Sequence, residues 1–450
     1  MKRFQKYALL VCMLAGCASY QARPLPMKAD WPEGLNRLKV DQAAMPMPEL
    51  AAHRFDPEDG LDMTEVAMIA VANNPQLKLA RDDAGISGAQ AYAAGLLPDP
   101  QFSFSPQFPQ NGIPGENVTA FDLGLSYNFG AIVTHSLQSR AARASLRQAD
   151  LILLWKEWQV VGQARLLFSR LCAMRNELGI MRARRRLAAM RHVQEKTALQ
   201  HGDLALPGVV ADENALQGID NQIVESERMM EKDRYALNAL LGLSPHTRLQ
   251  LVQDTEIPIL DREKIAGRLA GLSSMRPDLM ALRAGYDAQD MRLRLAILSQ
   301  FPAIQFGLVR ARDNTGINYE GVSLSLSLPI FNRNRGNIAV ARATRARLHD
   351  EFQIRLNAAY SDVEQILSDQ RLLEAQLAQL SGVLTNLERL SVRAESAYKA
   401  GDMDLAAYSS LKDAALSKKA EKYAIEESIF EERIALLTLL GGQLPVKESE

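Results

Sequence analysis

Few residues in this chain have types and spacings that could support chemistry. Its six histidines are scattered, without a pair at positions i and i+4, and the chain has no nucleophile elbow, phosphate-binding loop, dinucleotide fingerprint or zinc-ligand spacing. The pairs Met45 and Met47, and Met229 and Met230, could offer thioethers to a soft metal, but methionine usually fills gaps between packed helices. We therefore predict that the chain is not an enzyme and has no cofactor.

The first residues predict a covalent modification. A basic start precedes an apolar run over residues 7–15, which is typical of a secretory signal over residues 1–16. The sequence Leu14-Ala15-Gly16-Cys17 resembles the bacterial lipoprotein signal, which implies that Cys17 is lipidated. An ordinary signal peptide with an incidental cysteine is the alternative. No aspartate follows Cys17, and by the same resemblance this implies sorting to the outer membrane.

The chain contains one pattern twice. Pro75 corresponds to Pro277 and Phe129 to Phe331, each pair 202 positions apart, while Gly202 corresponds to Gly401 at a spacing of 199. A constant spacing over most of the chain indicates that one structural unit was duplicated and fused. We divide the chain into a signal peptide (1–16), a lipidated extended arm (17–60), a first repeat (61–242), a connecting segment (243–275), a second repeat (276–442) and a tail (443–450).

Each repeat is predicted to be mainly helical. Apolar residues recur at helical spacing over 63–97. Proline-free stretches over 132–200 and 334–400 predict helices about 100 Å long, and Gly202 and Gly401 stand where a C-cap would end them. Shorter helices are predicted over 205–241 and 404–440. Two shorter helices stacked end to end could flank each long one.

Between the helices, the period of the pattern changes to two. One parity is apolar, at Phe102, Phe104, Leu123, Leu125, Leu324 and Leu326, and the other is small or polar, as at Asp122, Ser323 and Ser325. This alternation predicts a β-hairpin in each repeat, and therefore four strands per chain with one apolar face. In a membrane the apolar parity would face lipid, whereas a soluble sheet packed on a core is the alternative. Four strands alone would leave two unpaired edges in lipid, so closure requires several chains.

The repeated order of helix, β-hairpin, long helix and helix resembles the TolC-like outer-membrane efflux protein family over nearly all of residues 60–442. The segment Leu328-Pro329-Ile330-Phe331-Asn332-Arg333-Asn334-Arg335-Gly336 resembles the strand-to-helix junction of its heavy-metal and multidrug branch, and Tyr398-Lys399-Ala400-Gly401 resembles its periplasmic hairpin tip. The resemblance implies a mainly α fold with a transmembrane β-barrel. It also implies a homotrimer with a single twelve-stranded barrel in outer-membrane lipid and a long coiled-coil tunnel in the periplasm.

The same resemblance implies a passive exit duct for small molecules or metal ions in a tripartite efflux pump. The partners would be a periplasmic membrane-fusion adaptor and an inner-membrane transporter of the resistance-nodulation-division type. The adaptor would contact the hairpin tips at Gly202, Asp203, Gly401 and Asp402. In the family a ring of aspartates narrows the tunnel beyond the second tip. Here the match is imperfect, because Ala407 and Ser410 stand where acidic residues are expected, so Asp402 and Asp404 become the candidate gate. These two carboxylates could instead cap the following helix, and both interpretations remain open.

Two other functions are compatible with this pattern. A duct for protein secretion would have the same architecture. A coiled-coil periplasmic adaptor or a structural lipoprotein belongs to a different class, but adaptors generally have one helical hairpin flanked by separate β-domains. The formal net charge of −1 gives no indication of a nucleic-acid partner.

Overall fold

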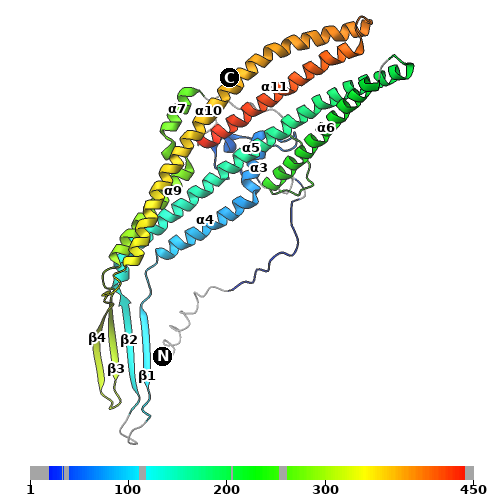
Figure 1. Ribbon diagram of the computed structural model, residues 1–450. Coiled ribbons are helices and arrows are strands. Elements are labelled where there is room, and N and C mark those ends of the chain that lie inside the picture. Colours follow the sequence, from blue (N-terminus) through cyan, green and yellow to red (C-terminus); the bar gives the residue numbers. More distant parts are fainter. Residues whose placement is uncertain are drawn as a thin grey trace.

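The computed structural model describes residues 20–32, 34, 40–110, 118–203, 206–252 and 261–440. The molecule is elongated, and a bundle of long helices continues at one end into a four-stranded sheet (Figure 1). The predicted signal peptide (1–16), Cys17 and the tail (443–450) lie outside the described residues.

The first repeat begins with a well-defined helix start. The side chain of Asp62 accepts a hydrogen bond from Glu65 N, and the side chain of Glu65 accepts one from Asp62 N, so two of the free N–H groups at this end are satisfied. The elements of this repeat are α3 (Met63–Asn73), α4 (Pro75–Ala94), β1 (Gln101–Gln107), β2 (Ala120–Asn128), α5 (Phe129–His201) and α6 (Leu206–Leu240).

The single helix predicted over 63–97 is wrong, because the chain breaks between α3 and α4. Pro75 has no N–H group and disfavours helical backbone at Asn74, which has φ −57° and ψ 125°. The side chain of Asn74 accepts a hydrogen bond from Leu77 N, which caps α4. Its amide donates to Leu240 O at the end of α6. The break is therefore held by specific contacts.

The connecting segment and the second repeat contain α7 (Arg262–Ala270), α8 (Leu272–Met275), α9 (Pro277–Leu298), β3 (Ile304–Arg312), β4 (Asn318–Leu326), α10 (Arg335–Ala400) and α11 (Leu405–Leu440). The predictions for the two long helices and the two helices that follow them are confirmed to within three residues at each end. At 1.5 Å per residue, α5 is about 110 Å long.

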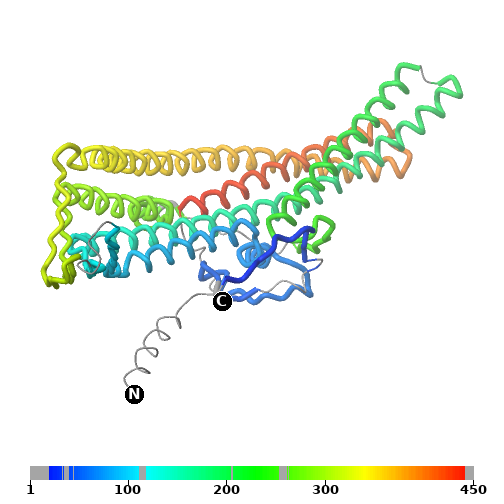
Figure 2. The backbone as a smooth tube through the Cα atoms, turned by 90° about the horizontal axis from the view of Figure 1, so that it is seen from below, coloured from blue at the N-terminus to red at the C-terminus, as the bar shows by residue number. Residues whose placement is uncertain are grey.

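The helices pack as the matching lengths predicted. Both α4 and α6 pack along α5, and both α9 and α11 pack along α10. The long helix α5 also packs against α9 and α11, which joins the two repeats. Figure 2 shows the hairpins α5–α6 and α10–α11 extending toward the same end of the molecule. The sheet lies at the opposite end (Figure 1).

All four strands form one antiparallel sheet in the order β1-β2-β3-β4. The two β-hairpins, β1–β2 and β3–β4, are joined through the pairing of β2 with β3, so the duplicated units share a continuous sheet. Since β2 runs directly into α5, the sheet and the helical bundle form one continuous wall.

The largest hydrophobic core lies where α3 and α6 meet the middle of α5, and it includes Val66, Ile69, Phe168 and Leu237. The N-terminal arm contains η2 (Gln42–Ala44) and α2 (Pro48–Ala52). It packs onto this core through Met45, Met47 and Leu50, and Leu50 of α2 is completely buried. Glu49 pairs with Arg165 of α5 at 2.9 Å, and both side chains are largely buried. The arm is therefore docked against the bundle around α2, whereas its residues 20–31 are exposed.

Candidate membrane surface and tunnel tip

One face of the sheet is apolar and exposed. The register aligns Phe102, Leu125, Leu308 and Val322 in one row across all four strands. Phe102 is 65% exposed. The six residues predicted to face lipid share this face, and they are Phe102, Phe104, Leu123, Leu125, Leu324 and Leu326. An apolar face of this extent is typical of a surface that is covered by lipid or by another protein.

The opposite face carries small and polar residues. Ser126, Gly307 and Ser323 lie side by side across three strands. A Cβ atom at Gly307 would lie 2.6 Å from Ser323 Oγ, and one at Gly124 would lie 2.6 Å from Ser103 Oγ. The two glycines therefore provide room for the neighbouring hydroxyl groups. A face of this kind suits a polar lumen.

The apolar face ends at charged residues near the strand ends. Arg310 lies opposite Leu123 on β2 and pairs with Glu320 on β4 at 3.6 Å. Arg312 lies over the ring of Phe121 and donates to Thr119 O. The apolar band is therefore bounded at the end of the sheet that lies far from the helices. This boundary could not be predicted from the sequence, because strand register decides which arginines share the apolar face.

Both outer strands have a free edge. In the described part of the chain β1 pairs only with β2, and β4 pairs only with β3. A free edge exposes backbone N–H and C=O groups, which hydrocarbon does not tolerate. If the apolar face meets lipid, these edges must pair with other chains.

The tips of the two hairpins are built alike. Gly202 and Gly401 have φ values of +83° and +84°, and these values confirm the predicted C-caps. Asp203 N donates to Ala198 O, and Asp402 N donates to Ala397 O, both at 2.9 Å. The duplicated glycine-aspartate pairs therefore close the two long helices in the same way.

The carboxylates after the second tip differ in their contacts. Asp404 Oδ1 accepts a hydrogen bond from Ala407 N at 2.6 Å, so Asp404 caps α11. The side chain of Asp402 is exposed next to it. The capping interpretation is thus observed for Asp404. The gate role of Asp402 and Asp404 stays a prediction.

Ion pairs connect the two hairpins to each other. Arg184 on α5 pairs with Asp413 on α11, with 2.7 Å between Nε and Oδ1. Farther from the tips, Arg170 pairs with Glu431, with 2.6 Å between Nε and Oε1. Sequence reasoning missed both pairs, because helical periodicity does not specify which distant carboxylate an arginine will meet.

Among the residues that the structure describes, no group of three or more histidine, cysteine, aspartate or glutamate side chains has an arrangement that could hold a metal ion. None of the described helices combines the length and apolarity needed to cross a membrane.

Solved structures of outer-membrane channels have the same fold. The CmeC outer-membrane channel of Campylobacter jejuni has a TM-score of 0.72 and 16% identity, with 96% of each chain covered. The MtrE outer-membrane channel of Neisseria gonorrhoeae, solved in an open state, has a TM-score of 0.70 and 15% identity, with 95% of this chain and 98% of that chain covered. The outer-membrane protein VceC of Vibrio cholerae has a TM-score of 0.69 and 15% identity, with 85% and 96% covered.

No protein-family model matches the chain, and no curated protein sequence matches it significantly. The similarity to the solved structures shows that the chain has the fold of these outer-membrane channels. The predicted fold class is confirmed in its long helices and four antiparallel strands per chain. The resemblance to TolC-like proteins is confirmed at the level of the fold.

Proposed function

We propose that this chain is the outer-membrane exit duct of a tripartite efflux pump. Three copies close their sheets into one twelve-stranded barrel, and their helices continue as a tunnel into the periplasm. The observation that carries the proposal is the sheet, which has one exposed apolar face, one small and polar face, and two free edges. The fold shared with outer-membrane channels supports the same function.

The barrel is anchored by its apolar face and by lipid on Cys17. Strands of seven to nine residues are close to the length that a tilted membrane strand needs. The far ends of the hairpins then lie deep in the periplasm, since α5 spans about 110 Å. Gly202, Asp203, Gly401 and Asp402 are the contacts for a membrane-fusion adaptor.

Transport through this duct is passive. The chain has no nucleotide-binding motif, so energy comes from an inner-membrane transporter of the resistance-nodulation-division type. Small molecules or metal ions are the cargo. A periplasmic adaptor is disfavoured as the function of this chain, because all four strands form a single sheet that continues both repeats.

Assembly and anchoring are tested by native mass spectrometry of the detergent-extracted protein. The expected particle contains three chains, each with an acylated Cys17 at its N-terminus. Replacing Cys17 with Ala removes the acyl mass, but the strands still insert. A folded monomer that stays soluble without detergent contradicts the proposed barrel. A mature chain with a free Ala18 contradicts the lipid anchor.

A further inference from the structure

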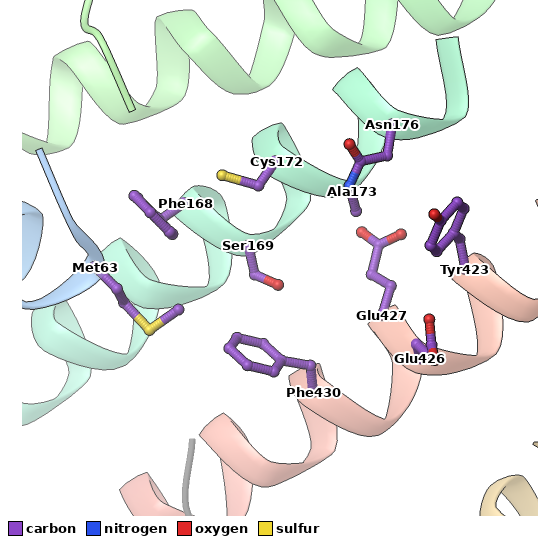
Figure 3. Close-up of a pocket in the computed structure, with 10 residues that line it drawn as sticks. All are labelled: Met63, Phe168, Ser169, Cys172, Ala173, Asn176, Tyr423, Glu426, Glu427 and Phe430. Carbon is purple, nitrogen blue, oxygen red and sulfur yellow. The ribbon is translucent and has the colours of Figure 1, made fainter. Parts of the chain in front are cut away.

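A cavity of about 180 Å³ lies between the two hairpins, at the middle of α5. Figure 3 shows that α5 and α11 form its long walls, with Met63 of α3 at one end. Phe168 and Phe430 contribute aromatic rings to the lining. The carboxylate of Glu427 points from α11 into the space beside Ala173 and Asn176 (Figure 3).

Glu427 faces mostly like charge. Glu431 on its own helix, Glu177 on α5 and Asp233 on α6 are the carboxylates that act on it, while Arg170 on α5 is the opposing cation. Arg170 is already engaged, because it donates two hydrogen bonds to Glu431. No hydrogen bond or ion pair joins Glu427 itself to another residue in the described ranges.

The other titratable groups on the wall do not supply a countercharge. Burial raises the pKa of the Cys172 thiol, which keeps it neutral. Glu426 pairs with Lys422 on its own helix at 3.4 Å. Tyr423 contributes an aromatic ring and a hydroxyl group. Burial first, and the neighbouring carboxylates next, raise the pKa of Glu427 from 4.5 to about 7.

We propose that Glu427 is a proton-binding site whose occupancy sets how closely α11 packs on α5. A protonated carboxyl group is neutral and fits a cavity walled by aromatic rings. An ionised carboxylate requires water and is repelled by Glu431, Glu177 and Asp233, which favours a wider separation of the two helices.

The direction of the pH effect follows from the raised pKa of Glu427. The closely packed arrangement retains its proton to about pH 7, whereas an exposed carboxylate loses it near 4.5. Close packing is therefore most stable at low pH and loses stability as the pH rises between these values. Above about pH 7 Glu427 is ionised in both arrangements, so a further rise in pH no longer weakens close packing.

This site lies at the contact between the two hairpins. The contact between α5 and α11 is the joint between the hairpins α5–α6 and α10–α11, and Arg170–Glu431 crosses it next to the cavity. The link to transport rests on the proposed function. There, separation of α11 from α5 widens the periplasmic end of the tunnel, so a rise in pH favours opening.

Hydrogen–deuterium exchange of the full-length protein tests the proton site directly. Amide protection is measured for peptides covering 168–176 and 423–430 from pH 5 to pH 8, with labelling times scaled for the intrinsic pH dependence of exchange. The shift of the Glu427 pKa from 4.5 to about 7 sets an upper limit of roughly 300-fold on the change in the packing equilibrium between low and high pH. Because Glu427 is only half buried, we expect protection to fall on the order of tenfold.

Two matched variants decide the outcome. Glu427→Gln keeps the shape of the side chain and should remain protected at every pH, and Glu427→Leu should behave in the same way. Glu426→Gln removes the neighbouring carboxylate of the same wall and should retain the response of the wild type. Protection that does not change with pH in the wild type overturns the proposal. A pH response in Glu427→Gln equal to that of the wild type overturns the proposal as well. Protection that is restored at pH 8 by adding K⁺ alone also overturns it, because the site would then bind a cation other than the proton.

Bilayer recording separates this inference from the proposed function. If amide exchange responds to pH but no channel current is recorded, the proton site is supported and the proposed duct function is contradicted. If the protein conducts but amide protection in α5 and α11 does not change with pH, the duct function is supported and the proton site is contradicted.

Discussion

Arg184 on α5 donates two hydrogen bonds to Asp413 on α11, with distances of 2.7 Å from Nε to Oδ1 and 3.2 Å from Nη2 to Oδ2. This fork joins the two hairpins on the tip side of the cavity that contains Glu427. Arg170 and Glu431 form a similar fork beside the cavity. These two polar pairs therefore link the hairpins in addition to the apolar packing of α11 on α5.

Breaking the outer fork should favour separation of the hairpins. The Arg184 and Asp413 side chains are 24% and 42% exposed, so the pair contributes about 0.5–1 kcal/mol. Asp413→Asn should raise the fraction of open channels roughly two- to fivefold in bilayer recordings. Glu225→Gln, which removes a pair within α6 only, is the control and should change nothing. An equal effect of both variants would count against a link between hairpins.

Charge on the apolar face of the sheet should block membrane assembly. Leu324→Arg places a cation where lipid is expected, and it should cost about 2–4 kcal/mol near the bilayer midplane. Ser325→Arg is the matched control, since Ser325 lies on the opposite face and would point into lumen water. Urea titration of the folded protein in lipid vesicles gives both values. Similar losses for the two variants would indicate that neither face meets lipid.

Glycine at the second tip should be needed for its backbone conformation alone. Gly401 has φ +84°, and a Cβ atom there would meet no heavy atom within 4 Å. Gly401→Val should therefore cost about 1–2 kcal/mol through strain, and should reduce export while the trimer still assembles. Gly382 lies inside α10 with equal space, so Gly382→Ala should stabilise the helix by about 1 kcal/mol. Thermal unfolding measures whether Gly401→Val lowers stability and whether Gly382→Ala raises it. Full export by Gly401→Val would contradict the proposed role of this tip.

The two aspartates after Gly401 can be separated experimentally. Asp404→Ser removes the charge but retains an oxygen that can cap α11, so helix stability should change little. If Asp404 also lines a narrow ring, this variant should relieve block by multivalent cations, as should Asp402→Asn. Unchanged block in both variants would show that the carboxylates serve only the local structure.

The sequence was most informative where a local rule acts alone. Gly202 and Gly401 end their helices because left-handed backbone favours glycine, and the alternation around Leu324 and Ser325 specifies two faces of a sheet. These rules predicted the long helices and the strand pairs. The repeat spacing added the relationship between the two halves.

The features that escaped prediction depend on tertiary partners. Pro75 was visible as a repeated residue, but the helix break is held by the contact of Asn74 with Leu240, 166 positions away. The pairing of Arg184 with Asp413 likewise joins residues 229 positions apart. The raised pKa of Glu427 arises from burial between helices of both repeats, which no local pattern reports.

Single-channel current across a planar bilayer tests the proposed duct most directly. The purified complex is added to one side, as wild type and as Asp413→Asn. Discrete current steps are expected from both, with a larger open fraction in the variant because its hairpins are less tightly joined. Complexes that contain three chains and insert into the bilayer, yet pass no current in either form, would contradict the proposal that this protein is an exit duct.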